Sequence, residues 1–511
     1  MALAGAIVKK SIRWVEQKGR QVKIPSVQQL ETLNGLLKKA EKTAFGKHYD
    51  FGRIQSQDTI QAFQEKVPIH DYDKMFDEWW HKSLHGQLDV CWPGKTKYFA
   101  VSSGTTGAAT KYIPVTHEML KAMQLVAWRM FTCLPKYDVP SHIFTKDWLM
   151  IGGTASLNFN GHCQTGDLSG ILAKQPPIWL RKFYKPGPKA AKITTWEERL
   201  DYIAKNAHHW DIGIVTGTPS WIQLTLEKII EYQHLDNIHQ IWPNFGVYVT
   251  GGIAFEPYRK SFEKLVAQVP IYQDSYLASE GFLGYQQRPG TNAKHLSINN
   301  GIFFEFVPFN DAHFDENGNI KPDAKALTIE QVEEGVDYAL LLSTCAGAWR
   351  YLIGDTVRFT NKALCEIIIT GRTKHFLSIC GEHLSVDNMN QAISHVENEL
   401  NIEILEFIVG AVKSGSHFAH RWYVGTKEPT DEQRLKFLLD EHLKKVNDDY
   451  AVERSAMLGD LELEVIPLQW FYDWQSATGR LNGQSKIPRV MKGEAFESWE
   501  SFVRQKQRGG A

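Results

Sequence analysis

The feature that most constrains this chain is a run of six residues, Ser102 to Gly107, that are all serine, glycine or threonine. An apolar stretch that begins at Phe99 leads into the run, and Lys111 follows it. Glycine lets the backbone turn tightly and approach a ligand closely. Hydroxyls and free N–H groups in such a turn can bind phosphate oxygens. The run therefore predicts a strand that ends in a phosphate-binding loop.

A solvated surface loop could have the same composition, and the run does not match the common P-loop. In that motif the lysine directly follows the second glycine, whereas Lys111 lies four residues after Gly107. Residues 118–134 then have apolar side chains at helical spacing, which predicts a helix. A strand, a turn and a helix in this order point backbone N–H groups at a phosphate. The context therefore favours the phosphate loop.

Composition excludes several classes of protein. A chain of 511 residues is expected to form about two to four domains. A net charge of −1 gives no electrostatic basis for binding nucleic acid or an anionic membrane surface. The six cysteines form no Cys-x-x-Cys pair, which argues against a zinc site and suits a reducing compartment. With no leader and no apolar run of membrane-spanning length, we expect a soluble cytoplasmic protein.

Strands and helices alternate through the first two thirds of the chain. Apolar runs that predict strands end in turns rich in glycine or threonine, at residues 148–153, 212–216 and 245–250. The last of these runs into Gly251 and Gly252. Alternation of this kind predicts an α/β sheet, whose ligands bind beyond the carboxyl ends of the strands.

Capping boxes predict where two of the helices begin. Ser26 and Gln29 have the required spacing before an apolar stripe that runs to Ala40, and Thr430 and Gln433 have it before a second stripe. We therefore predict helices that begin at these two boxes.

Two later segments contain residues suited to a nucleotide. In the segment 274–281, Tyr276 offers a flat ring and Glu280 offers an oxygen ligand for Mg²⁺, which generally takes one or two carboxylates from the protein. Asp355 ends the segment 349–355, and Gly371-Arg-Thr-Lys374 follows one further strand. Taken singly, each segment is weak evidence, because a structural tyrosine or a turn aspartate is common.

From about residue 375 the pattern changes. Its order is helix, strand, strand, helix, strand, which predicts a small α+β domain. We therefore predict a large domain of residues 1–374 and a small domain of residues 375–511.

Taken together, these motifs resemble the Gretchen Hagen (auxin-responsive) family of acyl-acid amido synthetases, a branch of the acyl-adenylating superfamily that includes acyl-CoA synthetases and luciferase. The segments that carry the resemblance span almost the whole chain: 43–46, 102–107, 276–280, 351–355 and 484–489. Two departures are Ser485, where the family has tyrosine, and Leu277-Ala278, where plant members have smaller residues.

The resemblance implies an α/β fold, with a large N-terminal adenylate-forming domain and a smaller, mobile α+β C-terminal domain. It implies that ATP, with Mg²⁺, adenylates a small carboxylic acid and that the acyl group then passes to an amine, such as an amino acid, to form an amide. Neither nucleic acid nor a membrane is expected as a partner.

The resemblance also assigns roles to single residues. The residues expected to act in catalysis are Lys486, Lys111 and Glu280, and Glu280 is also the expected Mg²⁺ ligand. The residues expected to bind the nucleotide are Ser102, Ser103, Gly104, Thr105, Thr106, Gly107, Gly251, Gly252, Tyr276, Ser279, Asp355 and Arg372.

Three alternatives remain at this point. An acyl-CoA synthetase would share the first half-reaction and differ in its acceptor. A stand-alone adenylating enzyme would pass its product to a separate carrier protein. A non-catalytic protein of the same fold would bind the nucleotide or the acid without reaction. If the protein catalyses adenylation followed by acyl transfer, the segment Gly371–Lys374 is the expected hinge between the two domains.

Overall fold

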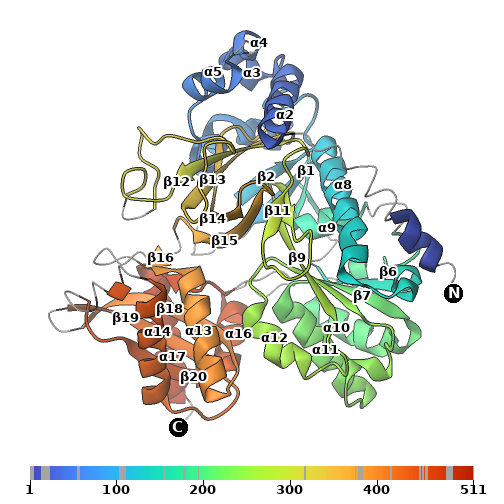
Figure 1. The fold of residues 1–511 in the computed structure, drawn as a ribbon, viewed down its shortest axis with the longest axis vertical. Helices are drawn as coiled ribbons and strands as arrows, with labels where there is room; N and C mark the ends of the chain where they lie inside the picture. The colour runs from blue at the N-terminus through green and yellow to red at the C-terminus, as the bar shows by residue number, and fades with distance from the viewer. Residues whose placement is uncertain are drawn as a thin grey trace.

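The computed structural model gives the fold of most of the chain (Figure 1). It describes residues 5–12, 24–54, 58–102, 111–152, 157–175, 180–193, 195–315, 318–374, 376–377, 384–414, 417–447, 450–451, 454, 458–478 and 487–509. In this part of the chain, no helix is both long enough and apolar enough to cross a membrane.

An eleven-stranded mixed sheet forms the centre of the molecule. In spatial order its strands are β12 (Ile302–Pro308), β13 (Asp337–Thr344), β14 (Tyr351–Asn361), β15 (Glu366–Arg372), β11 (Lys294–Leu296), β10 (Gly281–Tyr285), β9 (Ile271–Ala278), β8 (Val247–Gly251), β7 (Ile212–Gly217), β3 (Asp147–Met150) and β6 (Tyr184–Lys185). The strands from β9 to β6 are parallel, and those from β12 to β9 are antiparallel. This architecture confirms the predicted α/β class.

The parallel strands are buried on both faces, because helices cover each side. Val247 and Val249 of β8 join the core that includes α8 (His117–Cys133), whereas Tyr248 joins the core of α10 to α12. This alternation follows from the two-residue period of a strand. The helices of the second core are α10 (Trp196–Asn206), α11 (Pro219–Gln233) and α12 (Glu256–Glu263).

The N-terminal part packs helices against the antiparallel end of the sheet. These helices are α2 (Pro25–Ala40), α3 (Ala44–His48), α4 (Phe51–Ile54), α5 (Thr59–Lys66), α6 (Tyr72–Met75), a π-helical turn (Phe76–Trp80) and α7 (His81–Leu84). The capping box predicted at Ser26 is wrong, because α2 begins at Pro25 without a side-chain cap. Gln29 instead donates to the carbonyl of Ile298 and accepts from the N–H of Phe304, which joins α2 to the sheet.

The residues around the Ser/Gly/Thr run form a hairpin. β1 (Tyr98–Ser102) pairs antiparallel with β2 (Lys111–Val115), and Ser102 lies opposite Lys111. The predicted order of strand, turn and helix is therefore wrong, since a second strand stands between the turn and α8. The short strands β5 (Gln164–Gly166) and β4 (Asn158–Phe159) complete this sheet, and α9 (Leu168–Ala173) follows. Ser103 to Gly107 lie outside the described residues.

A second, four-stranded sheet lies in the C-terminal part, drawn in orange and red in Figure 1. Its strands are β20 (Glu462–Pro467), β19 (His417–Thr426), β18 (Ile404–Ser414) and β21 (Val490–Met491). Phe407 and Val409 face α13 (Val386–Leu400) and α14 (Glu432–Val446), whereas Ile408 faces α16 (Leu468–Ala477) and α17 (Glu494–Gly509). The short pair β16 (Phe376–Leu377) and β17 (Leu384–Ser385) precedes α13. We call residues 384–509 the small domain; the boundary at residue 374 stays a prediction.

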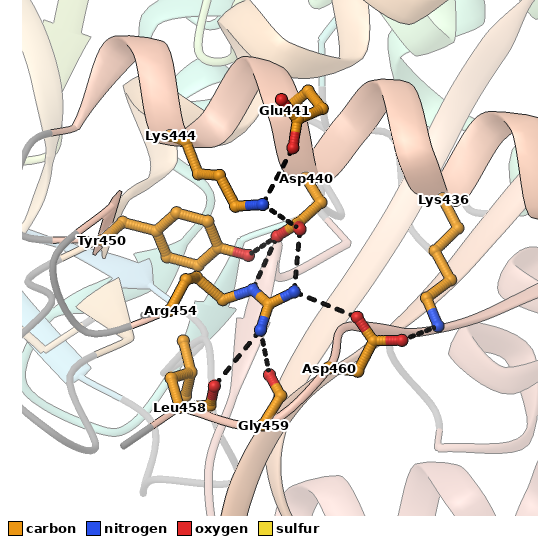
Figure 2. Close-up of polar contacts among 9 residues, drawn as sticks. All are labelled: Lys436, Asp440, Glu441, Lys444, Tyr450, Arg454, Leu458, Gly459 and Asp460. Carbon is orange, nitrogen blue, oxygen red and sulfur yellow. Dashed lines mark hydrogen bonds and ion pairs between the residues drawn. The ribbon is translucent and has the colours of Figure 1, made fainter. Parts of the chain in front are cut away.

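A network of charged residues fixes the segment after α14 onto that helix (Figure 2). The guanidinium of Arg454 donates from Nε and Nη2 to the two carboxylate oxygens of Asp440, both at 2.8 Å. Its other donors reach Asp460 and the carbonyls of Leu458 and Gly459, so all five N–H groups are used. Tyr450 donates to Asp440 at 2.6 Å. Burial alone would raise the pKa of Asp440, but the bonds from Arg454 and its neighbours outweigh it and lower the pKa to about 2.

We expect Arg454→Met to destabilise the small domain by roughly 3–5 kcal/mol, because it leaves the buried Asp440 carboxylate without its main cation. Lys444→Met is the matched control. Lys444 contacts the same carboxylate at 2.8 Å, but its side chain is 31% exposed, so its loss is expected to cost about 1 kcal/mol or less. The stability of both variants is measured by urea unfolding, with hydrogen exchange of the amides of α14 as the probe. Equal effects of the two variants would contradict the assigned role of Arg454.

Candidate nucleotide and acyl-acid site

One cavity of about 1620 Å³ opens at the carboxyl ends of the parallel strands. Thr216 and Gly217 at the end of β7, Gly251 at the end of β8 and Ala278 at the end of β9 line it. A pocket for one small ligand usually has a volume of about 300–1,000 Å³. This cavity is therefore large enough for two ligands side by side.

The structure brings most of the described candidate residues to this cavity. The predicted residues that line it are Lys111, Gly251, Gly252, Tyr276, Ser279, Glu280, Asp355 and Arg372. They come from five separate segments of the chain. Ser103, Gly104, Thr105, Thr106, Gly107 and Lys486 lie outside the described residues, and Ser102 is described only as the last residue of β1.

Asp355 is the centre of a three-residue cluster in the cavity wall. Its carboxylate accepts a hydrogen bond from the hydroxyl of Tyr276 at 2.6 Å and one from Nε of Arg372 at 2.7 Å. Asp355 and Arg372 lie opposite each other in the register of β14 and β15, so strand pairing itself brings these charges together. The Asp355 carboxylate raises the pKa of Arg372, which keeps the guanidinium charged. The side chain of Arg372 is 43% exposed and lines the cavity.

Glu280 is a buried carboxylate in the tight turn between β9 and β10. Burial raises its pKa to about 7, and the charge of Asp355 adds to that rise. The cations of Lys111 and Arg372 act in the opposite direction. A buried acid with a displaced pKa in a cavity is typical of a functional site.

The donor set around Glu280 fits a magnesium ion that is bound mainly by its substrate. Among the described residues, no group of three or more His, Cys, Asp or Glu side chains could hold a metal ion. Mg²⁺ usually keeps several waters and takes one or two carboxylates together with substrate phosphates. Glu280, beside Lys111 in the cavity, can supply that carboxylate oxygen.

Lys111 reaches the cavity from the first residue of β2. Burial lowers its pKa, and the carboxylate of Glu280 counteracts this. Its ammonium lies 5.1 Å from the ring centroid of Tyr72, whose hydroxyl accepts a hydrogen bond from the N–H of Tyr112. Tyr72 thus supports β2 and its lysine. No sequence motif indicates this contact, because Tyr72 and Lys111 are far apart in the chain.

The cavity also has an apolar region between α8 and the sheet. Met123, Ala127, Met130 and Phe131 line it from α8, and Trp148 lines it from β3. The rings of Phe131 and Trp148 stack with centroids 5.7 Å apart. No sequence pattern predicts this region, because aromatic residues in a pocket have the same pattern as aromatic residues in a core.

Three models of one protein family match successive parts of the chain. The GH3 family N-terminal domain matches residues 15–202, the central domain matches 295–365 and the C-terminal domain matches 387–495. Together they cover more than half of the chain.

Individual relatives and solved structures agree with this. The chain is 26% identical to indole-3-acetic acid-amido synthetase GH3.4 of Arabidopsis thaliana over 94% of its own length and 91% of the relative. It is also 26% identical to GH3.17 of the same plant, over 52% of its own length and 49% of the relative. The chain thus spans about half the length of several relatives that it matches.

Two structural neighbours have the same fold. GH3.15 acyl acid amido synthetase superposes with a TM-score of 0.75 at 16% identity, covering 96% of each chain. A 2-hydroxyisobutyryl-CoA ligase, solved in the postadenylation state with R3-HIB-AMP, superposes with a TM-score of 0.59 at 12% identity, over 94% of this chain and 91% of that one. The family predicted from the motifs is confirmed: this chain belongs to the GH3 family.

Proposed function

We propose that this chain is an ATP-dependent acyl-acid amido synthetase. In the first step, a carboxylate oxygen of the acid attacks the α-phosphorus of ATP and pyrophosphate leaves. In the second step, the nitrogen of an amine, most simply an amino acid, attacks the acyl carbon; AMP leaves and the nitrogen loses a proton. The observation that carries the proposal is the convergence of Lys111, Tyr276, Glu280, Asp355 and Arg372 on one cavity.

The contacts of these residues support separate roles in the first step. Asp355, held by Tyr276 and Arg372, has the charge needed to accept hydrogen bonds from the ribose hydroxyls. The ring of Tyr276, together with Gly251 and Gly252, forms the surface proposed for adenine. The same proposal assigns Ser279 to the nucleotide.

A separate set of residues is proposed to bind the phosphates of ATP. Lys111, Ser102 and the loop Ser103 to Gly107 would bind the β- and γ-phosphates, and Lys486 would contact the oxygens at the reacting phosphorus. Glu280 would hold Mg²⁺, which neutralises phosphate charge when bound. Two anions must meet in this step, so cations placed at the developing charge have the largest effect on the rate.

The apolar region lined by α8 and Trp148 is the proposed site of the acid. An apolar wall favours an acid whose body is hydrophobic, with its carboxylate at the polar end of the cavity.

We further propose residues 1–374 and 375–511 as the two domains. We propose the cytoplasm as the location of the protein, which suits six cysteines without a Cys-x-x-Cys pair.

Acid-dependent exchange of pyrophosphate into ATP, measured across a panel of carboxylic acids, tests the first step. Mass spectrometry of products formed with mixed amino acids then tests the second. Formation of an acyl-CoA with added CoA, and of no amide, would favour a CoA ligase instead. Absence of exchange with every acid would favour a non-catalytic binding protein.

We expect Ala127→Trp to raise the KM for hydrophobic acids roughly tenfold or more, because extra volume in a packed pocket costs about 1–3 kcal/mol. The KM for ATP should change less than about twofold, since adenine is proposed to lie elsewhere. Leu125→Trp on the same helix is the control, because Leu125 is 43% exposed. Equal changes in both KM values would place the acid elsewhere in the cavity.

A further inference from the structure

We propose that Tyr258, Glu406 and Arg489 are positioning residues that hold the small domain in the orientation needed for adenylation. This inference rests on the proposed function. Tyr258 belongs to α12 of the large domain, whereas Glu406 and Arg489 belong to the small domain. The three side chains line the same cavity as Glu280 and Asp355.

Glu406 binds one residue from each side of the interface between the domains. The hydroxyl of Tyr258 donates to Oε1 of Glu406 at 2.6 Å. Nη1 of Arg489 donates to Oε2 of the same carboxylate at 2.5 Å. The guanidinium of Arg489 also donates to the carbonyl of Leu405 and lies 4.6 Å from the ring centroid of Phe407. Arg489 is therefore fixed to β18, and Tyr258 fixes β18 to the large domain.

These contacts are buried. The other polar contacts between described residues across the interface include one from Nζ of Lys260 to the carbonyl of Glu397 at 3.0 Å, which is half-buried, and two ion pairs whose lysines are more exposed. Tyr258 is 2% exposed and Glu406 is 3% exposed. Leu405 packs into the core formed by α10, α11 and α12. By contrast, Lys264 in its pair with Glu403 is 66% exposed, and Lys427 in its pair with Glu227 is 42% exposed. Exposed pairs contribute little, whereas the Tyr258–Glu406 bond is buried and its acceptor is a carboxylate, so it is a strong polar contact that depends on how the domains are oriented.

Tyr258 and Arg489 lie close in the chain to segments on the two sides of the proposed site. Tyr258 lies six residues after Gly252, in the first turn of α12, and the glycine turn that precedes this helix lines the nucleotide side of the cavity. Arg489 lies three residues after Lys486, and the intervening Ile487 and Pro488 line the cavity. Fixing Arg489 therefore fixes Ile487 to Arg489, a segment of the small domain, at this wall of the cavity.

We infer that this arrangement serves the first half-reaction and must be released before the second. Tyr258→Phe removes the hydrogen bond from Tyr258 to Glu406 across the interface and keeps both members of the Glu406–Arg489 pair. We expect pyrophosphate exchange to fall roughly five- to tenfold, because a hydrogen bond to a charged group is lost from the adenylating arrangement. Amide formation from supplied acyl-adenylate should keep its wild-type rate or rise.

Tyr450→Phe is a matched control within the small domain. Tyr450 donates to Asp440 at 2.6 Å, and Asp440 is paired with Arg454 (Figure 2), so the chemistry of the lost bond is the same. This bond does not join the two domains. We expect Tyr450→Phe to lower the melting temperature without changing the ratio of the two half-reaction rates.

Hydrogen exchange of α12 and of the first residues of β18 gives a second measurement that needs no activity. Faster exchange at both sites in Tyr258→Phe, but not in Tyr450→Phe, supports the inference. An unchanged ratio of half-reaction rates in Tyr258→Phe, or the same change in Tyr450→Phe, overturns it. If the wild-type protein exchanges no pyrophosphate with any acid, the proposed function fails; unchanged hydrogen exchange in Tyr258→Phe then overturns the positioning role as well.

Discussion

Replacing Glu280 by glutamine is expected to lower acid-dependent pyrophosphate exchange roughly a hundred- to a thousandfold, the usual effect of losing one preorganised group at a developing charge. Glutamine keeps the shape of the side chain and removes the charge proposed to bind Mg²⁺. Thermal stability should not fall. The folded protein raises the pKa of Glu280 to about 7, so the ionised carboxylate is a cost to folding that glutamine removes.

The sign of the stability effect can be checked against pH. An acid whose pKa is raised in the folded state is disfavoured as its anion, so its stability cost grows as pH rises from the ordinary pKa of about 4.3 towards 7. The gain in Glu280→Gln should therefore be larger at pH 8 than at pH 5. Melting temperatures of both proteins across this range measure it.

Glu397→Gln is the control for loss of a buried carboxylate. Glu397 is 4% exposed, and burial raises its pKa to about 8, but it does not line the cavity. Its carboxylate accepts from the N–H of Ile404, and glutamine keeps that acceptor. We expect the rate of pyrophosphate exchange in Glu397→Gln to stay within about twofold of wild type. Near wild-type exchange by Glu280→Gln at limiting Mg²⁺ would contradict the assignment of Glu280.

The motifs predict which residues belong to the nucleotide site, but they do not predict how these residues contact each other. The motifs predict Tyr276 and Asp355 as nucleotide-binding residues from two separate segments of the chain. The structure adds that the tyrosine hydroxyl binds the aspartate and that Arg372 binds its other oxygen. The register of β14 and β15 determines this pairing. Register depends on the turn and on long-range packing, which a single sequence does not reveal.

A local sequence pattern also does not predict the structure where the same residues are compatible with two local structures. A strand followed by serine, glycine and threonine is compatible with a helix start or with a hairpin, and the chain forms the hairpin of β1 and β2. The helix predicted at Thr430 is confirmed, but its cap is Asp431, which accepts from the N–H groups of Gln433 and Arg434. Neighbouring residues that can all cap a helix leave the boundary uncertain by a residue or more.

Long-range contacts were the least predictable. Tyr258 and Glu406 are 148 residues apart, and nothing in either segment indicates the other. The apolar spacing of residues 118–134 predicts a helix, but it does not predict the apolar region of the cavity beside α8. Both features depend on which surfaces meet after folding. A motif marks residues of one segment, whereas these features belong to pairs of segments.

Replacing Lys486 by alanine is expected to lower the rate of adenylation roughly a hundred- to a thousandfold, while the affinity for ATP changes only a few-fold. The proposed lysine contacts oxygens whose negative charge grows during attack, so its effect is larger in the transition state than in the bound ground state. Single-turnover formation of acyl-adenylate measures the rate, and equilibrium binding of a non-hydrolysable ATP analogue measures the affinity.

Two further variants separate this role from others. Lys111→Ala should mainly weaken nucleotide binding, because Lys111 lines the cavity beside Glu280 and is proposed to bind the outer phosphates. Lys445→Ala, an exposed lysine of α14, should change neither measurement. A Lys486→Ala protein with normal adenylation and a lowered melting temperature would show a purely structural lysine. If adenylation and ATP affinity fell by equal factors, Lys486 would instead bind the ground state, and the cation at the reacting phosphorus would have to come from Arg372 or Lys111.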